Sequence, residues 1–204
     1  MAIATDEGML AIKEDKNNNY SHAEKLHVFI DEILKENQLK ITDLDAIAVS
    51  KGPGSYTGLR IGVSAAKGLC FSLEIPLISI STLKSLARQV KDKEALIIPL
   101  LDARRMEVYS AVFNAEFDRI RETQAEILEA DFYSEYLKKD KVVFIGSGVA
   151  KFQTICEHPN AIFVPDTLPS AKEMCKPAIE KFKINDTEDV AYFEPYYLKD
   201  FKAG

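Results

Sequence analysis

One stretch, Val49 to Leu73, runs from an apolar strand through a glycine-rich turn directly into a helix, and it reads VSKGPGSYTGLRIGVSAAKGLCFSL. Gly52 and Gly54 can adopt φ > 0 and carry no Cβ, and Pro53 restricts the backbone between them. A strand joined to a helix in this way indicates an α/β fold. The turn is therefore expected to present backbone amides at the start of the helix.

Several residues around this turn are candidates for holding an anion. Ser55 or Thr57 can cap the helix, and Gly58 lets another backbone or a bound group approach the first helical turn closely. The N–H groups at a helix N-terminus attract phosphate or carboxylate. A tight connection without a ligand explains the same pattern, so both interpretations stay open. The candidates for anion or nucleotide binding are Gly52, Gly54, Ser55, Thr57, Gly58 and Arg60.

Two standard phosphate-binding motifs do not match this turn. The P-loop needs a Lys followed by Ser or Thr after its last glycine, whereas Leu59 and Arg60 follow Gly58 here. The dinucleotide fingerprint needs the spacing G-x-G-x-x-G, whereas Gly52, Gly54 and Gly58 are spaced G-x-G-x-x-x-G. The turn is therefore a candidate site without a standard motif.

The motif SKGPGSYTGLRIG, followed by AAKGL and IPLISIS, closely resembles the TsaB family, which is also called YeaZ. The segments NYSHAEKL, DARRMEVYSAVF, GSGVAKF and EPYYLKDF match this family in the same order, so the resemblance covers nearly the whole chain. It implies an α/β, actin-like fold of the ASKHA, ribonuclease H-like type, duplicated, with two mixed sheets flanked by helices. It also implies a non-catalytic subunit of the bacterial machinery that makes threonylcarbamoyladenosine in tRNA.

Strand and helix patterns alternate along both halves of the chain, which suits the duplicated layout. We expect a division near Asp92, with an N-terminal actin-like half at 1–92 that holds the glycine loop and the partner helices, and a C-terminal actin-like half at 93–204. Family members usually begin with a further strand that carries a phosphate loop. Here Met1 stands directly before the first expected strand, so we expect that further strand to be missing.

Two helices are expected to form a partner surface. The helix at Ser21 to Glu36 has more apolar residues than one sheet face needs, and the helix after the glycine loop carries small residues every third or fourth position. Both helices could instead pack only on their own sheet. The resemblance favours pairing through both helices, with a TsaD-like catalytic subunit, a TsaE-like ATPase as third component, and a homodimer when alone. The expected interface residues are Leu26, Phe29, Ile33, Gly62, Ala65, Ala66 and Leu69.

The sequence offers no metal-binding cluster. The catalytic relative TsaD carries histidines where this chain reads Ser81-Thr82-Leu83-Lys84-Ser85, and His22, His27 and His158 are scattered. We therefore expect no catalytic residue, no metal and no cofactor. The alternatives are an actin-like ATPase or a nucleotide-binding regulator that uses the glycine loop, and a metallopeptidase is disfavoured because the histidines are missing.

Composition bears on partners and location. The formal net charge is −6, and no dense Lys/Arg run is present, so strong direct binding of tRNA by this chain alone is not expected. The sequence has neither a long apolar run nor a signal-peptide pattern, so we expect a cytoplasmic protein without a membrane partner. The three cysteines lack CxxC spacing, which favours reduced thiols.

Overall fold

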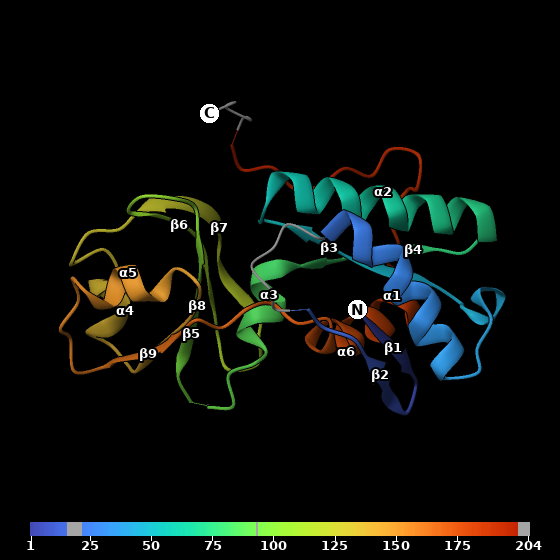
Figure 1. Ribbon diagram of the computed structural model, residues 1–204. Helices are drawn as coiled ribbons and strands as arrows, with labels where there is room; N and C mark the ends of the chain where they lie inside the picture. Colours follow the sequence, from blue (N-terminus) through green and yellow to red (C-terminus); the bar gives the residue numbers. More distant parts are fainter. Residues whose placement is uncertain (16–21, 93, 200–204) are drawn as a thin grey trace. The chain divides into compact units, whose positions relative to one another are not determined.

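The computed structural model describes residues 1–15, 22–92 and 94–199, and these form two compact units (Figure 1). The first unit consists of Met1–Ser81 and Ser170–Tyr197, and the second consists of Thr82–Pro169 with Leu198 and Lys199. This grouping differs from the expected division near Asp92. The residues that follow Ser81 belong to the second unit, and a segment late in the sequence returns to complete the first.

The first unit contains two separate two-stranded sheets where one mixed sheet was expected. The first pair is antiparallel and the second is parallel. The strands are β1 (Ala2–Thr5) with β2 (Gly8–Ile12), and β3 (Ile47–Gly52) with β4 (Leu77–Ser81). The helices are α1 (His22–Glu36), α2 (Tyr56–Leu73) and α6 (Lys172–Lys183), with a short 3-10 helix at Ile41–Asp43. Ser21, where we expected α1 to begin, lies outside the described residues.

Helix α6 connects these two sheets into one unit, and α2 covers one of them. Helix α2 packs on the β3–β4 pair through a core that contains Val49, Val63 and Cys70. Helix α6 contacts the β1–β2 hairpin as well as the β3–β4 pair. The two sheets are thus joined by helix packing, because no strand of the described residues pairs with both of them.

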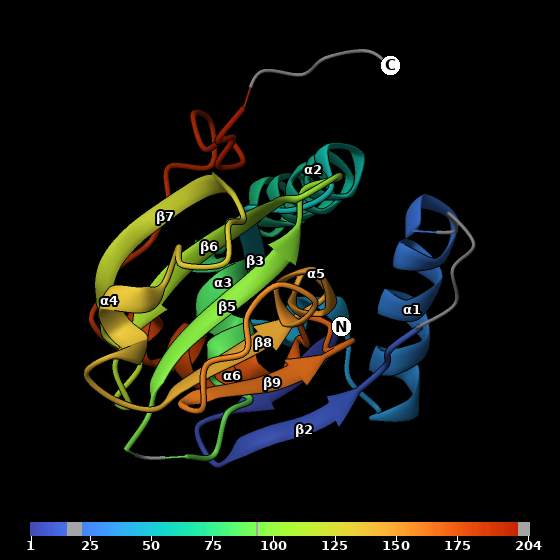
Figure 2. The ribbon, with the colours of Figure 1, turned by 90° about the vertical axis from the view of Figure 1, so that its left-hand side faces the viewer.

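The second unit confirms the expected mixed sheet flanked by helices. Its five strands lie in the order β7-β6-β5-β8-β9 (Figure 2), with β5, β6 and β7 antiparallel and β5, β8 and β9 parallel. The strands are β5 (Leu96–Asp102), β6 (Glu107–Phe113), β7 (Arg119–Ile127), β8 (Val142–Gly146) and β9 (Ala161–Pro165). The helices are α3 (Thr82–Ala87), α4 (Ser134–Leu137) and α5 (Val149–Gln153).

Residues of the central strand β5 alternate between the two faces of this sheet, as the period of a strand requires. Ile98 and Leu100 belong to the core that α5 covers through Phe152. Ile97 and Leu101 belong to the core on the other face, which α3 covers. The sheet is therefore buried on both faces, which explains why β5 reads as a continuous apolar run.

A buried charged network joins β6, β7 and the segment before α4 in the second unit. The Arg121 guanidinium forms an ion pair with Glu126 at 2.7 Å and donates to the Ser110 hydroxyl at 2.8 Å. The Tyr133 hydroxyl donates to Glu126 at 2.9 Å. Burial raises the pKa of Tyr133, with a further contribution from the Glu126 carboxylate, so the phenol keeps its proton and remains a donor.

Candidate functional site

The turn between β3 and α2 is capped by Ser55. Its Oγ accepts a hydrogen bond from the Gly58 amide at 3.3 Å, and its carbonyl accepts one from the Leu59 amide at 2.8 Å. Ser55 therefore takes the capping role for which Ser55 and Thr57 were both candidates, and Thr57 lies exposed in the first turn of the helix. The cap uses the Gly58 amide, which is one of the groups that an anion site would need.

Position 52 requires glycine because of its backbone conformation and because another backbone segment of the chain lies close to it. Its φ is +107°, and a Cβ added there would lie 3.0 Å from the carbonyl oxygen of Tyr196 and 3.1 Å from Cδ1 of Leu59. The Tyr196 amide also donates to the Lys51 carbonyl at 2.7 Å. The positive φ expected at Gly52 is therefore confirmed, and the space left by the missing Cβ is used by a segment late in the sequence.

The other residues of the turn lie more openly. Gly54 is exposed, and Cβ atoms added at Gly54 and Gly58 would meet only ordinary contacts of 3.8 Å and 3.4 Å. The Arg60 guanidinium lies 4.9 Å from the ring centroid of Tyr56, whose ring packs 5.0 Å from that of Tyr197. Arg60 is therefore positioned by aromatic contacts. Anion or nucleotide binding at this turn stays a prediction.

The segment Glu188–Tyr197, which we call the C-terminal strap, lies against the same part of the first unit. Lys67 of α2 donates through Nζ to the carbonyls of Ala191 at 3.1 Å and Phe193 at 2.9 Å. Val190 and Phe193 pack on the core beneath α2. We did not foresee the strap from the sequence, where the motif EPYYLKDF was its only signal.

The predicted partner residues on α1 and α2 divide into two groups. Ile33 is 2% exposed and Ala66 is 5% exposed, so both side chains are inside the unit and cannot contact a partner. Ala66 faces inward because it lies on the same side of α2 as Val63 and Cys70, which cover the β3–β4 pair. The remaining predicted residues are half-buried, and they are Leu26, Phe29, Gly62, Ala65 and Leu69.

Two exposed apolar residues on these helices were not among the predicted ones. Val28 on α1 is 51% exposed, and Phe71 near the end of α2 is 81% exposed. Their apolar character was visible in the sequence, but the stripes that we used pointed to the buried sides of the helices. We therefore define the helix-layer surface as Leu26, Val28 and Phe29 of α1 with Gly62, Ala65 and Leu69 of α2. Phe71 lies on the opposite side of α2 from Gly62, together with Ser64 and Lys67.

Among residues 1–15, 22–92 and 94–199, no three His, Cys, Asp or Glu side chains lie close enough together to hold a metal ion. His27 is exposed on α1, and Nδ1 of His158 accepts a hydrogen bond from the Asn160 amide at 3.2 Å. The described part of the chain also has no helix with the length and apolarity needed to cross a membrane.

Comparison with known proteins gives related families over most of the sequence. Residues 16–203 match the family model of TsaD, tRNA N6-adenosine threonylcarbamoyltransferase. The chain is similar to the tRNA threonylcarbamoyladenosine biosynthesis protein TsaB of Haemophilus influenzae, with 30% identity over 88% of this chain and 80% of the relative. The Escherichia coli protein of the same name is 29% identical over 88% of this chain and 81% of the relative.

Solved structures show the same fold. YeaZ from Pseudomonas aeruginosa superimposes with a TM-score of 0.81 at 23% identity, covering 97% of this chain and 92% of that protein. The fold is therefore the actin-like fold of these proteins, as the sequence motifs predicted. With the glycine turn, the capped α2 and matches over most of both chains in agreement, the chain belongs to the TsaB (YeaZ) family.

Proposed function

We propose that this chain is a non-catalytic subunit in the biosynthesis of tRNA threonylcarbamoyladenosine. It pairs with a TsaD-like enzyme and activates the transfer of the threonylcarbamoyl group to the adenosine next to the anticodon. A TsaE-like ATPase is the third component, and the assembly works in the cytoplasm. The names of the similar proteins from Escherichia coli and Haemophilus influenzae support the pathway.

The observation that carries the pairing is the helix-layer surface of the first unit. Helices α1 and α2 contact one another and lie side by side (Figure 1). Gly62 and Ala65 are small, so helices of a partner can approach α2 closely there. Val28 adds apolar area that the unit itself leaves uncovered. The chain forms a homodimer through the same surface when its partner is absent.

The contacts of the glycine turn and of the side chains around it favour a non-catalytic subunit. Gly52 serves the approach of the strap, and the Gly58 amide is used by the Ser55 cap. Arg60 stacks on Tyr56. These roles weaken the case for an ATPase or a nucleotide-binding regulator, because fewer groups of the turn are left for a phosphate.

The pairing is tested with one substitution and its neighbour on α2. Ala65→Arg places a charge among half-buried residues of the helix-layer surface, whereas Ser64→Arg places the same charge on the exposed side of the helix. We expect Ala65→Arg to weaken the complex with the TsaD-like enzyme of the same organism by about 100-fold or more, because the charge is unpaired in a dry interface. Ser64→Arg is expected to leave it within about threefold.

Isothermal titration calorimetry gives the dissociation constants, and circular dichroism of each variant shows that the fold is kept. Equal affinities for the two variants would remove the helix-layer model. Modification of tRNA by this chain alone, without a TsaD-like enzyme, would remove the non-catalytic role.

A further inference from the structure

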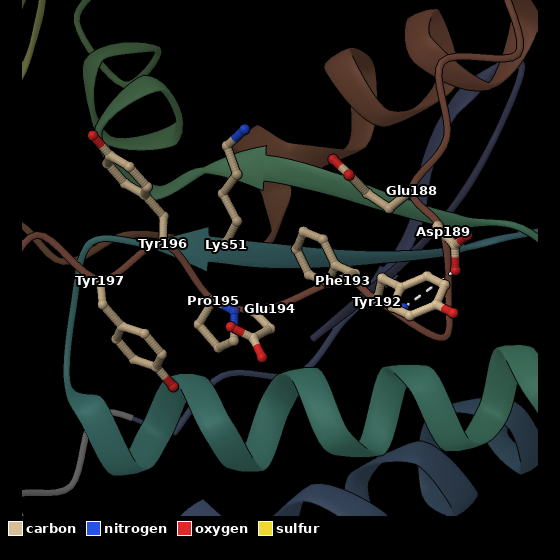
Figure 3. Close-up of a pocket in the computed structure, with 9 residues that line it drawn as sticks. All are labelled: Lys51, Glu188, Asp189, Tyr192, Phe193, Glu194, Pro195, Tyr196 and Tyr197. Atoms are coloured by element: carbon tan, nitrogen blue, oxygen red, sulfur yellow. Dashed lines mark hydrogen bonds between the residues drawn. The ribbon is translucent and has the colours of Figure 1, made fainter.

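The C-terminal strap and Lys51 of β3 line an open pocket of about 660 Å³ within the first unit (Figure 3). Its lining combines aromatic rings with more carboxylates than cations, because Lys51 is the single basic residue among three acidic ones. The charged and aromatic residues that matter for the argument are Lys51, Glu188, Asp189, Tyr192, Glu194 and Tyr197. Glu188 accepts a hydrogen bond from the Ser79 hydroxyl and Asp189 accepts two from backbone amides, so Glu194 is the carboxylate of the lining that we consider for a positively charged ligand.

The pocket is built from a segment whose backbone is fixed at several points. The Asp189 carboxylate accepts hydrogen bonds from the amides of Ala191 at 2.8 Å and Tyr192 at 3.2 Å. Lys67 holds the carbonyls of Ala191 and Phe193 from the other side. A lining that is held in place before binding loses less conformational entropy when a ligand arrives.

The strap buries only part of its aromatic surface. Phe193 packs against the core of the unit, whereas Tyr192 is 84% exposed. Tyr197 is also exposed, although its ring packs beside that of Tyr56. A segment that is anchored firmly but leaves these rings in solvent has aromatic surface that folding does not use.

The charged groups of the lining lie on two sides of the strands. In Figure 3 the Lys51 and Glu188 side chains lie on the side away from α2, whereas Glu194 and Tyr197 lie on the side that faces α2. The α2 side of the pocket therefore offers the Glu194 carboxylate and the Tyr197 ring. The Lys67 ammonium on this side is held by the carbonyls of Ala191 and Phe193. At the edge of this side, the guanidinium of Arg60 already lies over the ring of Tyr56.

We propose that this pocket binds an organic cation of the guanidinium or alkylammonium class. Glu194 supplies the opposite charge and Tyr197, which lies near it on the α2 side, supplies a ring face, whereas Tyr192 lies at the opposite end of the pocket (Figure 3). A basic side chain of another protein and a free polyamine share this chemistry. The inference concerns the isolated chain, so it stands or fails separately from the proposed role in tRNA modification.

The binding is tested by nuclear magnetic resonance with the full chain carrying ¹³C-labelled tyrosine. N-acetylarginine amide represents a protein side chain, spermidine represents a polyamine, and N-acetylglutamate amide is the anionic control. We expect saturable shifts of the Tyr197 ring with at least one cation and none with the anion, and smaller shifts of the Tyr192 ring at the other end of the pocket. Tighter binding of N-acetylarginine amide identifies a protein segment as the source, and tighter binding of spermidine identifies a polyamine.

Three variants with matched charge changes sharpen the test. Glu194→Gln is expected to weaken cation binding about fivefold or more, and Lys51→Gln is expected to strengthen it about twofold, because a like charge is removed. Glu7→Gln makes the same charge change at an exposed position of the β1–β2 turn and is expected to have no more than a slight effect. Circular dichroism checks that each variant is folded.

Several outcomes would overturn the inference. The first is the absence of saturable shifts with both cations. The second is an equal loss of affinity in Glu194→Gln and Glu7→Gln, which would indicate general attraction to an acidic chain. The third is binding of N-acetylglutamate amide that disappears in Lys51→Gln, which would make the pocket an anion site.

Discussion

The β-sheets of the two units are covered and held together in different ways. In the second unit, five hydrogen-bonded strands form one sheet whose two faces are both buried. In the first unit, two pairs of strands are joined through α6, and Met9, Leu10 and Ile12 of β2 remain exposed. The second unit is therefore stabilised mainly within its sheet, whereas the first depends on segments that arrive from distant parts of the sequence.

The difference is clearest in the cores. Phe144 of β8 is fully buried and packs with three other aromatic rings, Tyr133, Phe152 and Phe163, at centroid distances between 4.8 and 5.7 Å. The core of the first unit is a smaller cluster, and it is completed by Val190 and Phe193 of the strap. Substitutions in the core of the second unit should thus change the stability of its sheet directly. Substitutions in the core of the first unit should change stability by loosening its contacts with the strap.

The largest effect is expected from the buried charge of the second unit. Glu126→Gln leaves the Arg121 guanidinium without its counter-charge, and we expect a loss of about 3–5 kcal/mol in the free energy of unfolding. Urea unfolding followed by far-ultraviolet circular dichroism measures it. Glu122→Gln, on the same strand but in an exposed pair with Arg119, is the control, with an expected change below about 0.5 kcal/mol. Similar changes in both variants would show that the network adds no stability.

Smaller effects on the free energy of unfolding are expected from two glycines of the first unit, and these two effects have opposite signs. Gly52→Ala puts a Cβ at φ +107° against the Tyr196 carbonyl, so we expect a loss of about 1–3 kcal/mol. Gly68→Ala lies within α2 with open space around the new methyl group, so we expect a gain of about 0.5–1 kcal/mol. Urea midpoints of the two variants give the signs. A neutral Gly52→Ala would mean that the strap moves aside without cost.

The smallest effect is expected where α2 holds the strap. Lys67→Met removes the hydrogen bonds to the carbonyls of Ala191 and Phe193, and we expect about 1 kcal/mol of local destabilisation. Hydrogen exchange of the Tyr196 amide should become roughly fivefold faster, since its bond to Lys51 opens more often. Lys35→Met, at an exposed pair on α1, is the control. Unchanged exchange would show that the strap is held by its apolar residues alone.

Local structure could be predicted well from the sequence. A strand before the glycine turn and a helix directly after it were expected, and they are found as β3, which ends at Gly52, and α2, which begins at Tyr56. These elements are set by alternation of apolar residues, by glycine and by a cap, all of which act over a few neighbouring positions. The actin-like fold followed from the motifs, and the comparisons confirm it.

Long-range features could not be predicted in the same way. Lys67 and Phe193 are 126 residues apart, and nothing in the sequence around either residue shows that they meet. The inward position of Ala66 was missed because a stripe of small residues looks the same whether it faces a sheet or a partner. The pairing of Arg121 with Glu126 was visible only as two charges in a strand with alternating polarity.

The late return of α6 and the strap sets an order of events during synthesis on the ribosome. The second unit is almost contiguous, so all of its strands are translated before α6. The apolar faces of Val49 and Leu77 must wait for Val190 and Phe193, which follow more than a hundred residues later. A nascent chain from which β9 has emerged, but not yet the strap, would therefore carry a complete second sheet together with an unfinished first unit, and this is the species that a chaperone would meet.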